Sequence, residues 1–445
     1  MKINLPKNVE YIIHTLNKNN FSAYAVGGCI RDILINKEPK DWDITTNALP
    51  EDIIKIFKDT VPTGIKHGTI TVLINGTPYE VTTFRIDGKY TDNRHPDSVI
   101  FSNSLYEDLS RRDFTINSIS YNHKDGLQDP FNGKNDLQQK IIRCVGTPDL
   151  RFKEDSLRIL RAIRFSTQLN FKIEQITKHS LQKNSLLIKN VSMERIRDEL
   201  SKILLTNKPS VGFQLLKETK LLEIILPELS ICVGFNQHNP HHYKDIFDHT
   251  MMVLDNTSSN LIIRIAALLH DIGKPKCFSI DKNGIGHFYM HNIEGAKISQ
   301  EILSRLKFDN KTIKTVYTLI KEHLVNRNNL KIPAIKRFIN RVGIDNLNYL
   351  FDLQIADIKG HTPPHDFSPV FNLKISVNEI LAKKDPLNLK DLDITGNDLI
   401  KIGYSKGIII GKTLNELLEL VIKNPELNKK NILIPRAIKK LNYKK

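Results

Sequence analysis

Residues 24–43 constrain this chain more than any other stretch. An apolar run at residues 24–26 ends at Gly27-Gly28, and the residues that follow, from Cys29 to Ile35, have the pattern of a short amphipathic helix. Paired glycines between a strand and a helix let the backbone approach a ligand closely, and amides at a helix start favour phosphate. The stretch therefore predicts a phosphate-binding turn.

Two aspartates, Asp41 and Asp43, follow this turn in the sequence Asp-Trp-Asp. On a strand both carboxylates would face the same way, while Trp42 would face the core. Two close carboxylates can bind hard divalent ions, which activate an attacking oxygen and steady a leaving pyrophosphate. Glycine pairs and surface Asp-x-Asp strands are each common alone. Their order and spacing here predict phosphoryl or nucleotidyl transfer.

The composition indicates a large basic protein with a polyanionic partner. The chain has 445 residues, enough for two to four domains, and a net charge of +16. This charge favours nucleic acid over a membrane as the partner. The four cysteines form no Cys-x-x-Cys pair, which fits a reducing compartment, and no apolar run approaches the roughly 20 residues of a membrane span. We expect a cytoplasmic protein with no membrane segment.

A hairpin is predicted next in the chain. Residues 69–74 and 79–84 alternate like strands around Asn75-Gly76, a strong turn dipeptide. Glu80 lies on the second strand and is either a third acid beside the aspartate pair or an exposed strand residue. Residues 85–98 are polar and rich in Gly, Asn and Pro, so we expect a long mobile loop.

Two arginine-rich stretches follow. Arg111, Arg112 and Asp113 are expected on a helix, either as a solvated ion-pair face or as a clamp for a triphosphate. Beyond them, a second helix combines an apolar core face with a polar stripe, which is either an ordinary basic face or a surface that recognises bases and phosphates. The members of this stripe recur every three residues: Asp155, Arg158, Arg161 and Arg164.

The third constellation consists of histidines and aspartates with the ligand chemistry of a metal site. Each histidine alone would more often be structural, but an apolar helix that ends in His-Asp offers two ligands at one point. Distant helices can add the others. The residues concerned are His249, His270, Asp271, His291, His323 and Asp357. The basic tail, residues 423–445, is either a solvated helical end or a surface that follows a nucleic-acid backbone.

Taken together, these motifs resemble the bacterial class II polynucleotide nucleotidyltransferases, namely the tRNA CCA-adding enzymes and related poly(A) polymerases. The region after residue 236 resembles the HD-type metal domain that a subset of them carries. The resemblance is carried by Gly27-Gly28-x-x-Arg31-Asp32, Asp41-x-Asp43, Thr82-Thr-Phe-Arg85, Glu107-Asp-Leu-x-Arg-Arg112-Asp113, Asp136-Leu137 and Glu154-Asp155-x-x-Arg158-x-x-Arg161-x-x-Arg164-Phe165.

The resemblance implies a role for each matching residue. Asp41 and Asp43 would hold Mg²⁺ as the catalytic pair. Gly28, Arg31 and Arg112 would contact the triphosphate. Asp155 and Arg158 would pair with the base of CTP or ATP, supported by Arg161 and Arg164. The loop at residues 85–98 matches the flexible element that switches these enzymes from CTP to ATP. In the HD region, His249, His270, Asp271 and Asp357 would bind a second divalent metal of unknown identity, and His291 and His323 would complete a further position.

The resemblance also implies an α+β fold: a small N-terminal nucleotidyltransferase α/β head, an all-helical body, an HD domain and a helical tail. The expected domains are a head or palm (1–145), a helical nucleobase-reading neck with an RNA-binding region (146–235), an HD metal domain (236–370) and a basic helical tRNA-binding tail (371–445). Strands are expected mainly in the first 150 residues.

The predicted function is template-independent addition of CCA to the 3′ end of tRNA from CTP and ATP, with release of pyrophosphate. The alternatives are a poly(A) polymerase, an enzyme restricted to A-only or CC-only addition, an HD-domain phosphohydrolase as a second activity, and a pure tRNA-binding protein. Nothing in the sequence predicts an oligomeric state.

Overall fold

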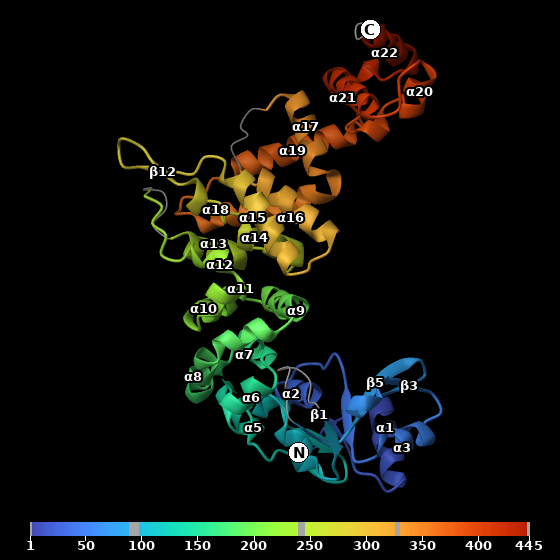
Figure 1. Cartoon of the computed structure of the whole chain (residues 1–445), viewed down its shortest axis with the longest axis vertical. Helices are drawn as coiled ribbons and strands as arrows, with labels where there is room; N and C mark the ends of the chain where they lie inside the picture. The colour runs from blue at the N-terminus through green and yellow to red at the C-terminus, as the bar shows by residue number, and fades with distance from the viewer. Residues whose placement is uncertain (1, 89–97, 239–244, 325–329, 443–445) are drawn as a thin grey trace. The chain divides into compact units, whose positions relative to one another are not determined.

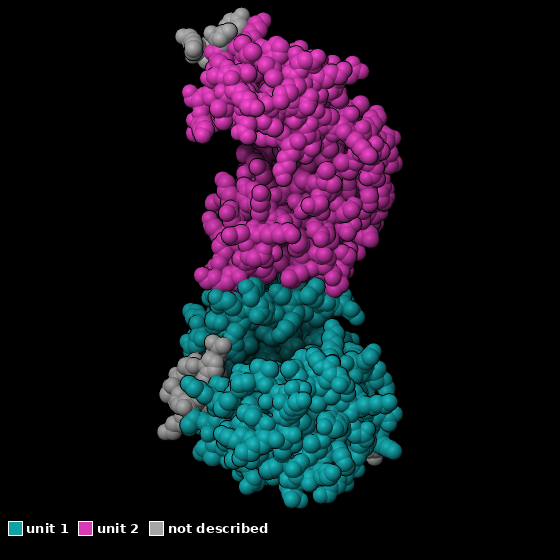
Figure 2. Space-filling model, turned by 90° about the vertical axis from the view of Figure 1, so that its right-hand side faces the viewer, with its two compact units in different colours: residues 1–230 teal, residues 231–445 magenta. Residues whose placement is uncertain are grey.

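The computed structural model of the chain describes residues 2–88, 98–238, 245–324 and 330–442. It has an α+β fold that divides into two compact units, residues 1–230 and 231–445 (Figures 1 and 2).

The first unit begins with a seven-stranded sheet. Its neighbouring strands run antiparallel except β2 and β5, which are parallel. Helices α1 and α3 pack beside this sheet (Figure 1). In spatial order the strands are β3 (Thr60–Gly64), β4 (Thr69–Ile74), β5 (Thr77–Thr83), β2 (Asp43–Thr46), β1 (Ala23–Val26), β8 (Ser120–Asn122) and β9 (Gly126–Gln128).

Helices make up the rest of the first unit, together with two short strand pairs. The pairs are β6 (Arg85–Asp87) with β7 (Val99–Phe101), and β10 (Ile141–Ile142) with β11 (Lys172–Ile173). The helices are α1 (Lys7–Lys18), α2 (Gly28–Leu34), α3 (Pro50–Ile56), α4 (Leu105–Ser110), α5 (Gly133–Gln139), α6 (Pro148–Glu154), α7 (Leu157–Leu169), α8 (Gln175–Lys183), α9 (Met193–Leu204), α10 (Pro209–Glu218), α11 (Leu221–Ile225) and α12 (Pro227–Ser230).

In its described residues, the second unit contains helices and the short hairpin of β12 (Ser279–Ile280) and β13 (Gly286–His287). Its last three helices enclose a small core of their own, in which Leu399, Leu417 and Leu433 are fully buried. Among the described residues, no helix is long and apolar enough to cross a bilayer. The helices are α13 (Ile246–Asp255), α14 (Leu261–Leu269), α15 (His291–Arg305), α16 (Asn310–Glu322), α17 (Ile332–Val342), α18 (Leu347–Gly360), α19 (Ser368–Ala382), α20 (Gly396–Lys401), α21 (Ile408–Lys423) and α22 (Lys430–Asn442).

The predicted hairpin is confirmed. β4 and β5 pair in antiparallel register, and both turn residues have positive φ angles, 51° at Asn75 and 77° at Gly76. The expected loop at residues 85–98 is partly wrong, because Arg85–Asp87 and Val99–Phe101 pair as β6 and β7. The predicted mobility of the segment between them concerns residues 89–97, which lie outside the described residues.

The expectation that both aspartates of Asp-Trp-Asp lie on one strand is wrong. β2 begins at Asp43, whose partner on β1 is Val26, the last residue of that strand. Gly27 then turns the chain away with φ 83°, so β1 offers no partner to Asp41 or Trp42. Trp42 is half-buried, whereas the prediction placed its side chain in the core.

One expected helix ends earlier than predicted, and another begins later. α4 ends at Ser110, before the arginines, because the Asp113 carboxylate accepts the N–H of Phe114 and competes with helical hydrogen bonding. Asp155 lies between α6 and α7, and its carboxylate accepts the N–H of Leu157. It therefore precedes the helix that carries the arginine stripe.

Candidate active site and metal cluster

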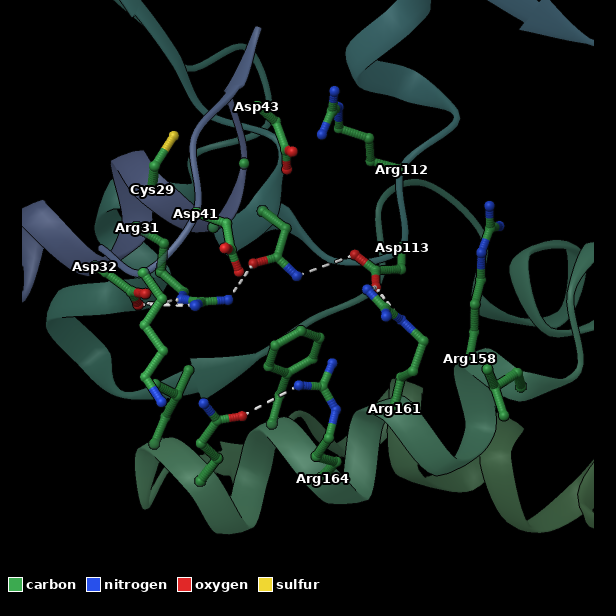
Figure 3. Close-up of a pocket in the computed structure, with 18 of the residues that line it drawn as sticks. Cys29, Arg31, Asp32, Asp41, Asp43, Arg112, Asp113, Arg158, Arg161 and Arg164 are labelled. Atoms are coloured by element: carbon green, nitrogen blue, oxygen red, sulfur yellow. Dashed lines mark hydrogen bonds and ion pairs between the residues drawn. The ribbon is translucent and has the colours of Figure 1, made fainter. Parts of the chain in front are cut away.

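A pocket of about 710 Å³ in the first unit collects every head and neck residue that the sequence predicted for the site. Figure 3 shows Asp41 and Asp43 on one wall and Arg161 and Arg164 reaching in from helix α7 on the other. The predicted residues that line it are Gly28, Arg31, Asp41, Asp43, Arg112, Asp155, Arg158, Arg161 and Arg164.

The glycine turn brings the backbone close to one of these arginines. Gly27 has a φ of 83°, a conformation that residues with a side chain rarely adopt. A Cβ at this position would lie 3.1 Å from Nη1 of Arg112. The turn therefore needs glycine for its backbone conformation and for the close approach of the guanidinium.

Three carboxylates gather around the start of β2. Asp43 on β2 lies opposite Glu80 on β5, so Glu80 stands beside the aspartate pair and is at the same time an exposed strand residue. Burial raises the pKa of Asp43; Arg112 opposes the shift and Asp41 adds to it. Burial also raises the pKa of Glu80, and Asp43 and Asp41 reinforce the effect. A divalent cation would relieve this repulsion, so the carboxylates fit a metal site.

Protein partners orient the arginines expected to contact the triphosphate. Arg31 donates to Asn117 at 2.8 Å and pairs with Asp32 at 2.7 Å. Arg112 lies 3.4 Å from the buried carboxylate of Asp108. These contacts leave both guanidiniums on the pocket wall. Asn117 also lines the pocket and was not predicted from the sequence.

Helix α7 presents its arginines to the pocket through ion pairs. Arg161 forms two contacts with Asp113, at 2.6 and 2.8 Å. Burial alone would raise the pKa of Asp113, but Arg161 and the Asn117 amide lower it to about 2. Arg158 is turned toward Glu154, 2.6 Å away, and donates to the carbonyl of Arg111 at 2.8 Å.

Helix α9 supplies ion-pair partners for two of the predicted site residues, Asp155 and Arg164. Arg195 pairs with Asp155 at 3.0 Å, and the buried Glu199 pairs with Arg164 at 2.6 Å. The Arg164 guanidinium also lies 3.9 Å from the centre of the Phe165 ring. Arg195 and Glu199 were not predicted from the sequence, although their i, i+4 spacing places both on one helix face.

The predicted histidines and aspartates of the second unit also come together. His249 lies on α13, His270 and Asp271 directly follow α14, and Asp357 lies on α18. Nε2 of His249 is 3.1 Å from Oδ1 of Asp357, and Nε2 of His270 is 3.3 Å from Oδ2 of Asp271. His291, the first residue of α15, lies 3.5 Å from Asp271, and His323 follows α16 within the same group of ligand atoms.

The imidazoles are oriented like metal ligands. Nδ1 of each ring faces a backbone carbonyl, which accepts only, so Nδ1 must donate and Nε2 is left toward the carboxylates. The four pairs are His249 with Gly360 (3.3 Å), His270 with Ala267 (2.8 Å), His291 with Phe288 (2.7 Å) and His323 with Ile320 (2.6 Å).

The protonation of these rings supports the same interpretation. Burial lowers the pKa of His249, and a neutral His249 cannot donate to both Gly360 and Asp357. Burial also lowers the pKa of His323 to about 4. At His270 burial is outweighed by Asp271, which raises the pKa to about 10, yet Nε2 makes no well-oriented hydrogen bond. A cation among these Nε2 atoms and carboxylates would satisfy them, so the residues fit a divalent metal.

Comparison with known families agrees with both sites. The Poly A polymerase head domain family matches residues 23–143, and the family described as the probable RNA and SrmB-binding site of polymerase A matches residues 170–232. The HD domain family matches residues 246–358. A CCA-adding enzyme of Lactobacillus johnsonii is 45% identical over 422 residues, which cover 93% of this chain and 94% of that enzyme. The chain belongs to the CCA-adding enzyme family.

Other members of this family agree over the same length. The CCA-adding enzyme of Lactobacillus helveticus is 35% identical over 93% of this chain and 92% of its own. The crystal structure of the Bacillus stearothermophilus CCA-adding enzyme in complex with CTP matches with a TM-score of 0.71 and 26% identity, covering 99% of both chains. The chain is thus a nucleotidyltransferase, and its two domain types imply dependence on divalent metal.

The packing around the histidine and aspartate cluster depends on a glycine. A Cβ at Gly273 would lie 2.3 Å from the carbonyl oxygen of His291 and 2.5 Å from the amide of Gly295. We expect Gly273→Ala to push α15 away and lower the free energy of unfolding by about 1–3 kcal/mol. Chemical denaturation measures this loss. Gly411→Ala is the matched control, because nothing lies within 4 Å of its added Cβ, and it should be neutral or slightly stabilising. Equal stability of the Gly273→Ala protein would contradict the packing argument.

Proposed function

We propose that this chain adds C, C and A stepwise to the 3′ end of tRNA that lacks them, using CTP and ATP. The observation that carries the proposal is the single pocket in which an acidic metal-binding wall faces the arginines of helix α7. Such a pocket can hold a triphosphate by its charge and a base by hydrogen bonds, without a template strand.

In the proposed reaction the terminal 3′ hydroxyl attacks the α-phosphate and pyrophosphate leaves. Asp41 and Asp43 would hold Mg²⁺, with Glu80 beside them, and Arg31 and Arg112 would bind the triphosphate. When bound, Mg²⁺ supplies activation of the hydroxyl and charge neutralisation at the leaving group. Gly28, at the start of α2, would let the triphosphate approach the backbone.

Base selection is assigned to Asp155 and Arg158, with Arg161 and Arg164 in support. When a nucleotide binds, each of these four residues would either leave its protein partner for the base or contact both at once. The protein partners are Arg195, Glu154, Asp113 and Glu199. We expect Asp155→Ala to reduce the preference between CTP and ATP by about tenfold or more, because a good base pair contact contributes about 1–3 kcal/mol of discrimination. Steady-state kinetics with each nucleotide measures this ratio, with Asp149→Ala, an acid paired with Lys183 outside the pocket, as the control. An unchanged ratio would exclude the assigned role.

The nucleotide requirement decides between this function and its alternatives. With a tRNA that lacks its end, we expect two additions from CTP alone, none from ATP alone, and three from both together. Long A tracts from ATP alone would instead identify a poly(A) polymerase. Additions that stop after CC with both nucleotides would identify a partial enzyme. Sequencing-gel resolution of the products separates these outcomes.

The tRNA would be bound by the basic helical parts of the chain, whose net charge of +16 suits a polyanion. We keep the four-part division into a head (1–145), neck (146–235), HD domain (236–370) and basic tail (371–445) as part of this proposal. The cytoplasm, where such an enzyme would meet tRNA and nucleoside triphosphates, is the proposed location.

The HD cluster favours a second function, metal-dependent hydrolysis of phosphoesters. His249, His270, Asp271 and Asp357 would hold a divalent ion other than the Mg²⁺ of the head, since imidazole ligands favour transition metals. Water would attack phosphorus and the ester oxygen would leave. The observation that supports it is the set of buried Nε2 atoms aimed at two carboxylates.

A further inference from the structure

A histidine outside the predicted motif stands at the edge of the HD cluster. His361 comes four residues after Asp357, and its Nε2 lies 3.5 Å from Oδ1 of that carboxylate. Its ring centre is 4.8 Å from that of His249. Its side chain is 35% exposed, whereas that of His249 is 3% exposed. His361 therefore lies on the solvent side of the cluster.

The ligand atoms of the cluster fall into three groups of three, each with all its atoms within 4.8 Å of one another. Two of these groups have no residue in common, so each could hold its own cation without competing for a ligand. The outer triad is His249, Asp357 and His361; the inner triad is Asp271, His291 and His323; the third group, His249, His270 and Asp271, bridges them.

We propose that His361 is a metal ligand that completes the outer triad, which holds one divalent cation; the second cation, at the inner triad, occupies the further position that the resemblance to HD domains already implies. Two imidazoles and one carboxylate in each triad suit a borderline transition-metal ion. His270, which lies near both carboxylates, can complete either coordination sphere. The proposal deepens the hydrolase function above, because it rests on the same metal cluster.

The arrangement of the outer triad supports coordination. Asp357 lies in the last turn of α18, and His361 directly follows this helix, four residues further on. Nε2 of His249 and Nε2 of His361 converge on the same oxygen of Asp357, at 3.1 and 3.5 Å. The competing explanation is that His361 only donates a hydrogen bond to Asp357. That explanation predicts no effect of His361 on the number of bound ions.

Cobalt(II) titration of the metal-free full-length chain distinguishes the two explanations. The chain should carry Asp41→Ala and Asp43→Ala so that the head carboxylates do not contribute. We expect two ions to bind per chain, with visible absorption typical of nitrogen and oxygen ligands. His361→Ala should then lose one ion, or weaken it at least about tenfold, and keep the other. Added imidazole should restore the lost ion.

Two further variants make the result specific. His323→Ala should weaken the inner ion and leave the ion that depends on His361 in place. His287→Ala is the matched control, because this half-exposed histidine pairs with Asp281 outside the cluster, and it should bind both ions normally. Circular dichroism and thermal unfolding check that each variant is folded, and His361→Gln replaces His361→Ala if the latter unfolds.

Two outcomes would overturn the proposal. Binding of both ions with unchanged affinity after loss of His361 would show that it is not a ligand. Absence of cobalt binding by the parent chain would overturn the proposal and the hydrolase function together. Two ions with no phosphoester hydrolysis would reject the hydrolase function alone, and none of these results bears on CCA addition.

Discussion

Replacement of Asp43 by alanine should lower the rate of nucleotide addition by at least roughly a thousandfold, with CTP and with ATP alike. Metal-ion stabilisation of a transition state contributes several kcal/mol, and about 4 kcal/mol corresponds to three orders of magnitude. Asp43 lies at the start of β2 opposite Glu80 and beside Asp41, so its loss removes a central ligand. Single-turnover kinetics with a tRNA that lacks its end measures the chemical step directly.

The tRNA affinity of the same variant should change by less than about threefold, because a phosphate-tracking surface is spread over many cations. Asp59→Ala is the matched control: this residue is an exposed carboxylate of the same head that does not line the pocket, and its replacement should leave the rate unchanged. Normal transfer by the Asp43→Ala enzyme would reject the metal assignment. Equal loss in the Asp59→Ala enzyme would point to general damage of the head.

Lower pH should also reduce nucleotide addition, because it weakens metal binding by the carboxylates of the head. The pKa values of Asp43 and Glu80 are raised by burial and mutual repulsion, so these groups take up protons at a higher pH than ordinary carboxylates. A protonated carboxylate binds metal poorly. The metal concentration needed for half-maximal addition should therefore rise as the pH falls toward these pKa values. A requirement that does not change with pH would contradict the arrangement.

Replacement of His270 by alanine should abolish phosphoester hydrolysis, with at least a hundredfold loss, while CCA addition continues. His270 is fully buried and its Nε2 faces Asp271 and Asp357 at 3.3 and 3.5 Å, so its loss removes a ligand that can serve either cation. A chromogenic phosphodiester supplied with a transition metal reports the hydrolysis. The same preparation tested for nucleotide addition reports the head.

The reciprocal experiment measures phosphoester hydrolysis in the variant that has lost nucleotide addition. Asp43→Ala should keep the hydrolysis that His270→Ala loses, because the two clusters lie in separate compact units. His287→Ala should keep both activities. Hydrolysis that survives in the His270→Ala protein would exclude the HD cluster as its source. Hydrolysis absent from the unaltered chain would leave the cluster without this function.

Local sequence patterns predicted the fold well where local forces decide it. The hairpin around Asn75-Gly76 follows from two residues that tolerate positive φ, and both adopt it. The core face of α7 follows from the helical period, and Leu157, Ile159, Leu160 and Ile163 are all buried. Such features depend on neighbours within one turn or one hairpin, so the sequence contains the information directly.

Element ends were predicted less well because partners elsewhere in the chain set them. β2 begins only at Asp43, opposite Val26, where its partner β1 ends. The helix before Arg111 stops because Asp113 bonds locally to Phe114 and meets Arg161 of α7. Neither the length of a partner strand nor a distant ion pair appears in the periodicity of the segment itself.

The sequence by itself determined the chemistry of this protein: a glycine turn, paired carboxylates, an arginine helix and a set of histidines and aspartates. The tertiary structure alone decided which of these groups face one another. It paired Asp155 with Arg195 and Arg164 with Glu199, placed Glu80 beside Asp43, and brought His361 to the metal cluster. The reason is that these contacts join different helices and strands, and their geometry arises from packing, which no single segment encodes.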